Sequence, residues 1–318
     1  MDIATPVVTL DDIEAAAMRI KSRVRRTPCI RSRFNLASLG AGELLLKLEC
    51  LQVTGSFKAR GASNAILSLD KASVKRGVIT ASGGNHGLAV AYASHASETS
   101  ALIYLPEITP QAKADKMRAW GAEVVIEGAV WDDANDAAVA RAERDGLTYI
   151  HPFADPAVIA GQGTAGREML KQASHIDVMI VAIGGGGLIS GIATAAKAIK
   201  PDIKIIGVEP VGAPTLTTSL AAGVVTTLPE IKTDAVTLAP RRSAEINLGI
   251  IRDNVDEIVL VDDDAMRKAA QWLWFEVGIA AELSGAASIA AIQTGKVDVP
   301  EGATVAAVIC GAGSDGVI

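Results

Sequence analysis

A single lysine and the aromatic residue before it are the first candidates for chemistry in this sequence. Lys58 follows Phe57 at the start of a predicted helix, after an apolar segment at residues 44–49 that predicts a strand. A lysine at such a turn lies in a cleft, where burial beside an aromatic ring lowers the pKa of its amine. A neutral amine is a nucleophile toward aldehydes, so Lys58 is a candidate Schiff-base residue. The competing interpretation is a solvated surface lysine, the common case for a lysine taken alone.

Four consecutive glycines form a second candidate site. They occupy positions 184–187, directly after an apolar segment that predicts a strand and directly before a predicted helix. Because glycine has no side chain, successive backbone N–H groups can point to one anion, and the helix N-terminus adds partial positive charge. The pattern therefore predicts a phosphate-binding turn made of Gly184, Gly185, Gly186 and Gly187.

Two cofactors fit such a turn. A strand, a glycine-rich turn, a helix and a further strand ending at Glu209 are also typical of a dinucleotide-binding unit, which would indicate an NAD-binding oxidoreductase. The GxGxxG spacing fails, however, because Ser190 stands where the third glycine would be. Lys58 favours pyridoxal phosphate (PLP), whose aldehyde requires a lysine in addition to a phosphate pocket.

Another strand-to-helix turn carries a Ser-Gly-Gly-Asn-His segment. Its backbone amides predict a second anion site, suited to the carboxylate of a substrate. The alternative is a plain helix cap, the commoner meaning of Ser followed by Gly. His86 is a candidate general base, although a histidine in such a turn more often serves as a hydrogen-bonding scaffold. The residues of this predicted substrate site are Ser82, Gly83, Gly84, Asn85 and His86.

These segments resemble the motifs of one family, the fold-type II PLP enzymes of the serine/threonine dehydratase and serine racemase group. The matching segments, in that group's order and at similar intervals, are residues 54–62, 81–87, 160–164, 184–188, 207–210 and 310–314. The resemblance covers nearly the whole chain. It implies an α/β fold with two doubly wound parallel-sheet domains, similar to the tryptophan synthase β subunit.

The resemblance also implies a role for each candidate residue. Lys58 would hold PLP and then remove the α proton of the substrate. Asn85 would bind the phenolic oxygen of PLP, and Cys310 would face its pyridine nitrogen as a largely neutral partner, which suits β-elimination. Taken alone, Cys310 is more simply a buried core cysteine. The cofactor-binding residues predicted in this way are Phe57, Lys58, Asn85, Gly184, Gly185, Gly186, Gly187, Leu188 and Cys310.

Departures from the racemase-like members favour a lyase acting on L-threonine or L-serine. Gly83 stands where similar racemases place a serine as the second base, and Phe153 stands where they tend to carry Asn. Ala134 falls near where they carry an arginine, which leaves no obvious cation for the second carboxylate of 3-hydroxyaspartate. The alternatives are a lyase for that substrate or for a hydroxyectoine-derived compound, a serine racemase, and a non-catalytic relative that binds a small ligand.

Glu209 and Ala213 resemble the small cation site of the racemase-like members. Thr215 stands where those proteins place a second carboxylate. The resemblance thus supplies one of the two carboxylates of a divalent or monovalent cation site. If no metal binds, Glu209 simply closes a strand.

The composition argues against several classes of protein. A formal charge of -6 with acids and bases interspersed, and no basic stripe with aromatic residues, argues against nucleic acid. Three cysteines suggest neither a disulfide framework nor a zinc site, and the N-terminal segment is too acidic for a signal peptide, so we expect the cytoplasm. The uncharged run at residues 178–196 is divided by its glycines, which argues against a membrane span. The expected partners are a small amino-acid substrate and, from the resemblance alone, a second copy in a homodimer.

Strands and helices alternate along most of the chain. Apolar runs of strand length near residues 78–80, 101–105 and 123–126 are each followed by a helical pattern. This alternation predicts right-handed crossovers and parallel sheets. We expect a large PLP-binding domain of residues 1–73 and 150–318, with a small domain of residues 74–149 inserted in it. The site should lie in the crevice between them, at the carboxyl ends of strands.

Overall fold

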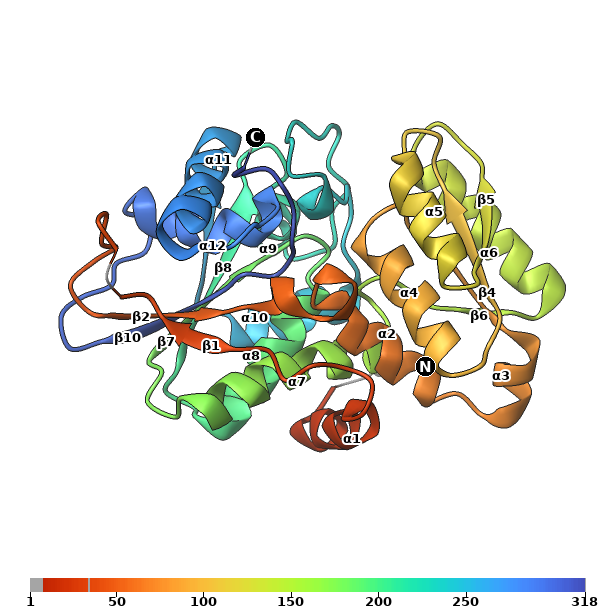
Figure 1. Ribbon diagram of the computed structural model, residues 1–318, viewed down its shortest axis with the longest axis horizontal. Coiled ribbons are helices and arrows are strands. Elements are labelled where there is room, and N and C mark those ends of the chain that lie inside the picture. Colours follow the sequence, from red (N-terminus) through yellow and green to blue (C-terminus); the bar gives the residue numbers. More distant parts are fainter. Residues whose placement is uncertain (1–7, 34, 318) are drawn as a thin grey trace.

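The computed structural model describes residues 8–33 and 35–317, which form two sheets covered by helices (Figure 1). The larger sheet has the strand order β1-β2-β10-β7-β8-β9. β1 runs antiparallel to β2, and every other neighbouring pair is parallel. Its strands are β1 (Cys29–Arg31), β2 (Glu43–Lys47), β7 (Val178–Ala182), β8 (Lys204–Pro210), β9 (Glu257–Val261) and β10 (Thr304–Val308). The predicted α/β fold with parallel sheets is confirmed.

The smaller sheet has the order β5-β4-β3-β6, and all of its pairs are parallel. Its strands are β3 (Val78–Ala81), β4 (Ala101–Leu105), β5 (Glu123–Ile126) and β6 (Thr148–Tyr149). The helices that follow β3, β4 and β5 in the chain are α4 (Asn85–Ala96), α5 (Gln111–Ala119) and α6 (Trp131–Asp145). This sheet lies within the segment predicted as the small domain, whose boundaries stay a prediction.

Helices cover both faces of the larger sheet. In Figure 1, α7 and α8 lie on one side of it and α11 and α12 on the other, and α1 packs against α7. Among the described residues, no helix has the length and apolar character that a membrane crossing needs. The remaining helices, with these, are α1 (Leu10–Ile20), α2 (Lys58–Leu67), α3 (Lys71–Arg76), α7 (Pro156–Gln172), α8 (Gly187–Ile199), α9 (Thr215–Ala222), α10 (Glu245–Asn254), α11 (Asp263–Trp272) and α12 (Leu283–Gln293).

Local sequence explains where several helices begin and end. The side chains of Thr9 and Asp12 exchange hydrogen bonds with each other's backbone N–H groups, which caps α1. Asp155 caps α7, and proline occupies the first position of that helix. At its C-terminal end, α11 continues into a π-helical turn, Leu273–Val277, which ends at Gly278 with φ +73°.

The central strands are buried along their whole length because helices cover both of their faces. All five residues of β10 are buried, as are all four of β3 and all five of β4. The short elements β1, β6 and α3 were not anticipated, because segments of two to six residues carry too little periodic pattern to be recognised.

A buried network of charges joins the larger sheet to α2 and α7. Lys47 is fully buried in β2, and its Nζ lies 2.6 Å from Glu168 Oε1 on α7 and 2.9 Å from Thr27 O. Arg60 on α2 is 1% exposed and donates to Glu49 Oε1 at 2.7 Å and to Glu168 Oε1 at 3.2 Å. Two cations face two carboxylates, so the network is neutral as a whole. It fixes α2 in place because an unpaired charge at this depth would be costly.

We expect the Arg60→Leu variant to unfold at a markedly lower temperature, because it leaves the carboxylate of Glu49 buried and unpaired at a cost of about 3–5 kcal/mol. Adding Glu49→Gln should recover much of the loss by removing that charge. Calorimetric unfolding of the two variants measures this, with Arg144→Ala as the control, since the Arg144–Asp145 pair is exposed. An Arg60→Leu midpoint as high as that of the control would contradict the prediction.

Candidate active site

The predicted cofactor residues lie together because their strands are neighbours. β2, β10 and β7 are adjacent and parallel, so their carboxyl ends meet at one edge of the sheet. The chain leaving β2 leads to Lys58, the chain leaving β10 reaches Cys310, and the chain leaving β7 forms the glycine turn. Ligand sites in such sheets form at this edge.

Main-chain pairing joins the segment before Lys58 to the turn after β10. Ser56 forms a β-bridge with Gly311, Phe57 N donates to Cys310 O at 3.2 Å, and Ala312 N donates to Gly55 O at 2.8 Å. Thr54, in the same segment, has a φ of +63°, which a β-branched residue adopts only when its surroundings impose it. The segment is therefore held in one conformation, and it aims Lys58 into the site.

The amine of Lys58 is partly desolvated. Its Nζ donates a hydrogen bond to Pro152 O at 2.7 Å and lies 5.1 Å from the centroid of the Phe57 ring. Burial lowers the pKa of the Lys58 amine to about 8, and the nearby Cys310 and Glu282 oppose part of that shift. About half of such amines are neutral near pH 8, whereas a lysine with its ordinary pKa is almost wholly protonated there.

The glycine turn is closely packed on its inner side. A Cβ on Gly185 would overlap the Phe153 ring, one on Gly187 would lie 2.8 Å from Phe153 O, and one on Gly184 would lie 2.9 Å from Thr237 O. Gly186 has a φ of +94° and precedes α8, whose first N–H groups have no partner within the helix. The turn thus presents backbone N–H groups where no side chain fits, which suits a phosphate. The predicted neighbour Leu188 is buried in α8.

The Ser-Gly-Gly-Asn-His turn follows β3 and opens α4. Gly84 N donates to Ser82 Oγ at 3.2 Å, which closes a local turn, whereas no side chain caps α4 at its N-cap residue, Gly84. A Cβ on Gly83 would overlap the Thr109 hydroxyl, and a side chain there would need Thr109 to move. The N-terminus of α4 remains available to an anion such as a substrate carboxylate.

Two histidines, buried His86 and half-buried His151, line this region as neutral scaffolds. His86 Nε2 lies 3.0 Å from Ile150 O, and burial, with a smaller effect of Lys58, lowers the pKa of His86 to about 3. His151 Nδ1 accepts from Phe153 N at 3.2 Å and from Ala154 N at 2.9 Å, and burial lowers the pKa of His151 to about 4. Neither pKa suits a general base near neutral pH. His151, which places the loop that Lys58 contacts, was not among the predicted site residues.

Cys310 is a neutral group in the site. Its Sγ donates to Ser284 O at 3.3 Å, and burial raises the pKa of the thiol well above its ordinary range. A neutral thiol is the partner that the resemblance to the family implies for the pyridine nitrogen of PLP, a role that stays a prediction.

Glu282 is the main residue that sequence reasoning missed. Its Oε1 accepts hydrogen bonds from Asn85 Nδ2 at 2.8 Å, Ser284 Oγ at 2.5 Å and Thr237 Oγ1 at 3.3 Å. Burial raises the pKa of the Glu282 carboxyl, and these donors and Lys113 counteract it. The sequence signal was ambiguous because an acid directly before a helix is normally a cap. Glu282 instead accepts from the side chains of Asn85 and Ser284, and the Ser284 carbonyl accepts from Cys310 Sγ.

The carboxylate of Glu209 has hydrogen-bond partners that the sequence did not reveal. Its carboxylate accepts from Leu216 N at 2.7 Å and from Thr217 N at 2.9 Å, so it caps α9. Ala213 lies buried nearby in the chain. No group of three or more His, Cys, Asp or Glu side chains with metal-binding geometry exists within residues 8–33 and 35–317. The cation predicted at Glu209 and Ala213 stays a prediction.

The comparison with known families decides the nature of the cofactor. The model of a family described as "Pyridoxal-phosphate dependent enzyme" matches residues 20–311. The chain belongs to this family. The Lys58 amine and the glycine turn fit the aldehyde and the phosphate of its cofactor, and the nicotinamide alternative is set aside.

Curated relatives and solved structures agree with this assignment. An L-threonine ammonia-lyase of Thermotoga maritima is 39% identical over 97% of this chain and 76% of its own. A catabolic L-threonine dehydratase, TdcB, of Staphylococcus aureus is 38% identical over 97% of this chain and 90% of its own. The crystal structure of T.th. threonine deaminase has a TM-score of 0.89 at 39% identity, covering 96% of this chain and 98% of that one. Maize serine racemase has a TM-score of 0.91 at 36% identity, covering 96% and 94%.

We expect Gly185→Ala to weaken PLP binding by about 10- to 100-fold, because the added methyl group overlaps the Phe153 ring and such overpacking costs about 1–3 kcal/mol. Titration of the apo-protein with PLP, followed by absorbance, measures the affinity. Gly249→Ala is the matched control, since its Cβ would meet nothing within 4 Å. Equal affinity in the two variants would show that the turn does not bind the cofactor.

The lowered pKa of Lys58 also predicts selective labelling. In the apo-protein, an amine-reactive reagent such as trinitrobenzenesulfonate should modify Lys58 half-maximally near pH 8, because the neutral amine is the reactive form and burial makes it abundant there. Mass spectrometry of peptides gives the labelled fraction at each pH, with peptides carrying exposed lysines as the internal reference. Labelling of Lys58 that rises only in step with those exposed lysines would refute the assigned pKa.

Proposed function

We propose that this protein removes the β-hydroxyl group and the amino group of L-threonine or L-serine, giving a 2-oxo acid and ammonia. The observation that carries the proposal is the amine of Lys58, with its pKa of about 8, beside the glycine turn in a chain of the PLP family. The names of the relatives, threonine ammonia-lyase and threonine dehydratase, support the same reaction.

The side chains of the site supply binding and proton transfer. PLP, when bound, supplies an electron sink that acidifies the α C–H bond of the amino acid. The glycine turn binds its phosphate, and the N–H groups around Ser82 and Gly84 orient the substrate carboxylate. Lys58, in its neutral form, accepts the α proton. Loss of the β-hydroxyl as water and hydrolysis of the resulting enamine then yield 2-oxobutanoate from threonine or pyruvate from serine.

Asn85, Cys310 and Glu282 orient the site without exchanging protons with the substrate. The Asn85 amide is placed by Glu282 at 2.8 Å, and Ser284 connects the same carboxyl to Cys310. Burial raises the pKa of the Cys310 thiol, so Cys310 would offer the cofactor's ring nitrogen a neutral partner that limits its protonation. This arrangement supports elimination from the β carbon.

Serine racemisation is the second candidate, favoured by the likeness to maize serine racemase. Racemisation requires an acid or base on the face of the substrate opposite Lys58. Gly83 offers no side chain there, although the Thr109 hydroxyl lies beside it. Lys113, whose charge acts on Glu282, is a cation near the site, and it keeps 3-hydroxyaspartate among the substrates to be tested. Assembly as a homodimer is a further part of the proposal, to be measured by light scattering.

The holoenzyme should release ammonia and a 2-oxo acid from L-threonine, L-serine or both faster than from D-serine or 3-hydroxyaspartate. Lys58→Ala should lower the rate by about 10²- to 10⁴-fold, because it removes the general base. Lys268→Ala, an exposed lysine on α11, is the control and should retain full activity. Ammonia and oxo-acid assays measure elimination, and chiral chromatography measures racemisation. Racemisation of serine without ammonia release would overturn the proposal.

A further inference from the structure

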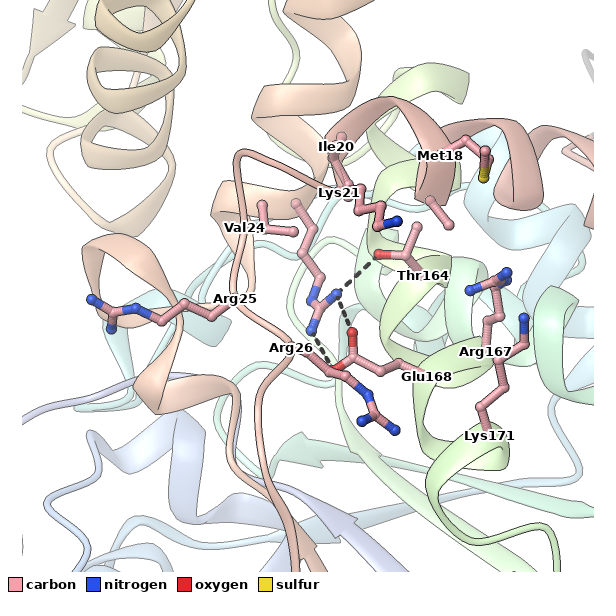
Figure 2. A pocket seen from close by; sticks show the side chains of 12 residues that line it. Met18, Ile20, Lys21, Val24, Arg25, Arg26, Thr164, Arg167, Glu168 and Lys171 are labelled. Carbon is pink, nitrogen blue, oxygen red and sulfur yellow. Dashed lines mark hydrogen bonds and ion pairs between the residues drawn. The ribbon is translucent and has the colours of Figure 1, made fainter.

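A second pocket lies away from the active site, between α1, the segment that follows α1, and α7 (Figure 2). It encloses about 420 Å³. Both apolar and cationic side chains line it. The lining residues are Ala17, Met18, Ile20, Lys21, Val24, Arg25, Arg26, Arg60, Thr164, Arg167, Glu168 and Lys171.

The buried floor of this pocket is the back of α2. Arg60 follows Lys58 by two positions, and successive side chains of a helix are about 100° apart, so the two point to opposite sides of α2. Arg60 donates to Thr164 Oγ1 at 3.2 Å and to Glu168 Oε2 at 3.3 Å. The floor is electrically balanced, because Arg60 belongs to the neutral network with Glu49, Lys47 and Glu168.

The rim, in contrast, carries excess positive charge. Figure 2 shows Lys21, Arg26, Arg167 and Lys171 around the opening. Within the described part of the chain, Glu14 is the carboxylate paired with them, and it contacts Arg167 and, at 4.0 Å, Lys171. Lys21 and Arg26 have no hydrogen-bond or ion-pair partner among the side chains of the described residues. Such a concentration of cations stands out in a chain whose formal charge is -6.

The fifth rim cation points elsewhere. Arg25 donates to Leu51 O at 2.8 Å, and in Figure 2 its guanidinium extends away from the opening. It therefore has a structural role, which distinguishes it from Lys21 and Arg26.

We propose that this pocket binds a small dianion, a phosphate or a dicarboxylate carried on a short organic group. The planar guanidinium of Arg26 can donate paired hydrogen bonds to an oxyanion, and Lys21 and Lys171 add charge, while Arg167 keeps its ion pair with Glu14. The apolar side chains of Ala17, Met18 and Val24, which also line the pocket, contact the organic part of the ligand. A bound dianion offsets the mutual repulsion of the rim cations, and it joins α1 to α7 over the back of α2.

The test uses the holoenzyme, in which PLP occupies the glycine turn. Isothermal titration with inorganic phosphate, and separately with succinate, at constant ionic strength should give saturable binding, and the unfolding temperature should rise with either ligand that binds. The Lys21→Gln/Arg26→Gln variant should bind at least about tenfold more weakly, because charge-assisted hydrogen bonds are worth about 1.5–3 kcal/mol each.

A matched control separates local binding from overall charge. Arg144→Gln/Arg252→Gln also removes two exposed cations, but from ion pairs on other helices, and it should bind within about twofold of the unaltered protein. Saturable binding of phosphate alone or succinate alone supports the pocket and identifies the ligand chemistry. Absence of saturable binding of both probes, or equal affinity in the two double variants, overturns the proposal.

Discussion

Main-chain pairing between two segments from opposite ends of the chain places the reactive amine of this protein. The bridge between Ser56 and Gly311, with the hydrogen bond from Phe57 N to Cys310 O, joins the approach to Lys58 to the end of the last strand. Because β10 lies between β2 and β7, the same strand also brings both segments beside the glycine turn. The geometry of the site thus depends on where the last strand enters the sheet.

Close packing at the glycine turn and burial of charge around α2 complete the site. Phe153 fills the space that a side chain at Gly185 would need, and its loop also supplies the carbonyl that accepts from Lys58. On the other side of α2, Arg60 is held by Glu49 and Glu168. A helix fixed on both sides keeps the Lys58 amine desolvated, which is the cause of its lowered pKa.

The side of α2 opposite Lys58 forms the floor of the proposed anion pocket. The network that holds Arg60 is neutral, but the rim outside it has more cations than acids. A ligand that binds there contacts the helices that support α2, while the chemistry takes place on the opposite side of that helix. The catalytic and the proposed anion site therefore share a support and have separate openings.

Local patterns in the sequence were enough to predict the fold class, and they placed the candidate cofactor residues at turns that follow strands. The alternation of strand and helix specified parallel sheets, and the carboxyl ends of parallel strands are where Lys58, Gly184 and Cys310 had to be. These inferences rest on local pattern, which each segment carries without its partners. The choice of PLP over a dinucleotide likewise followed from the residue types at two turns.

Contacts between segments that are distant in the sequence brought the other side chains to the site. Glu282 has the sequence of a helix cap, and its hydrogen bond with Asn85 arises because the N-terminal ends of α12 and α4 meet, although they are far apart in the chain. Glu209 resembles a cation ligand in sequence, yet its oxygens accept from the backbone of α9. The lowered pKa of His151 and the charge excess at Lys21 and Arg26 depend on burial and on distances between segments, and sequence carries neither quantity.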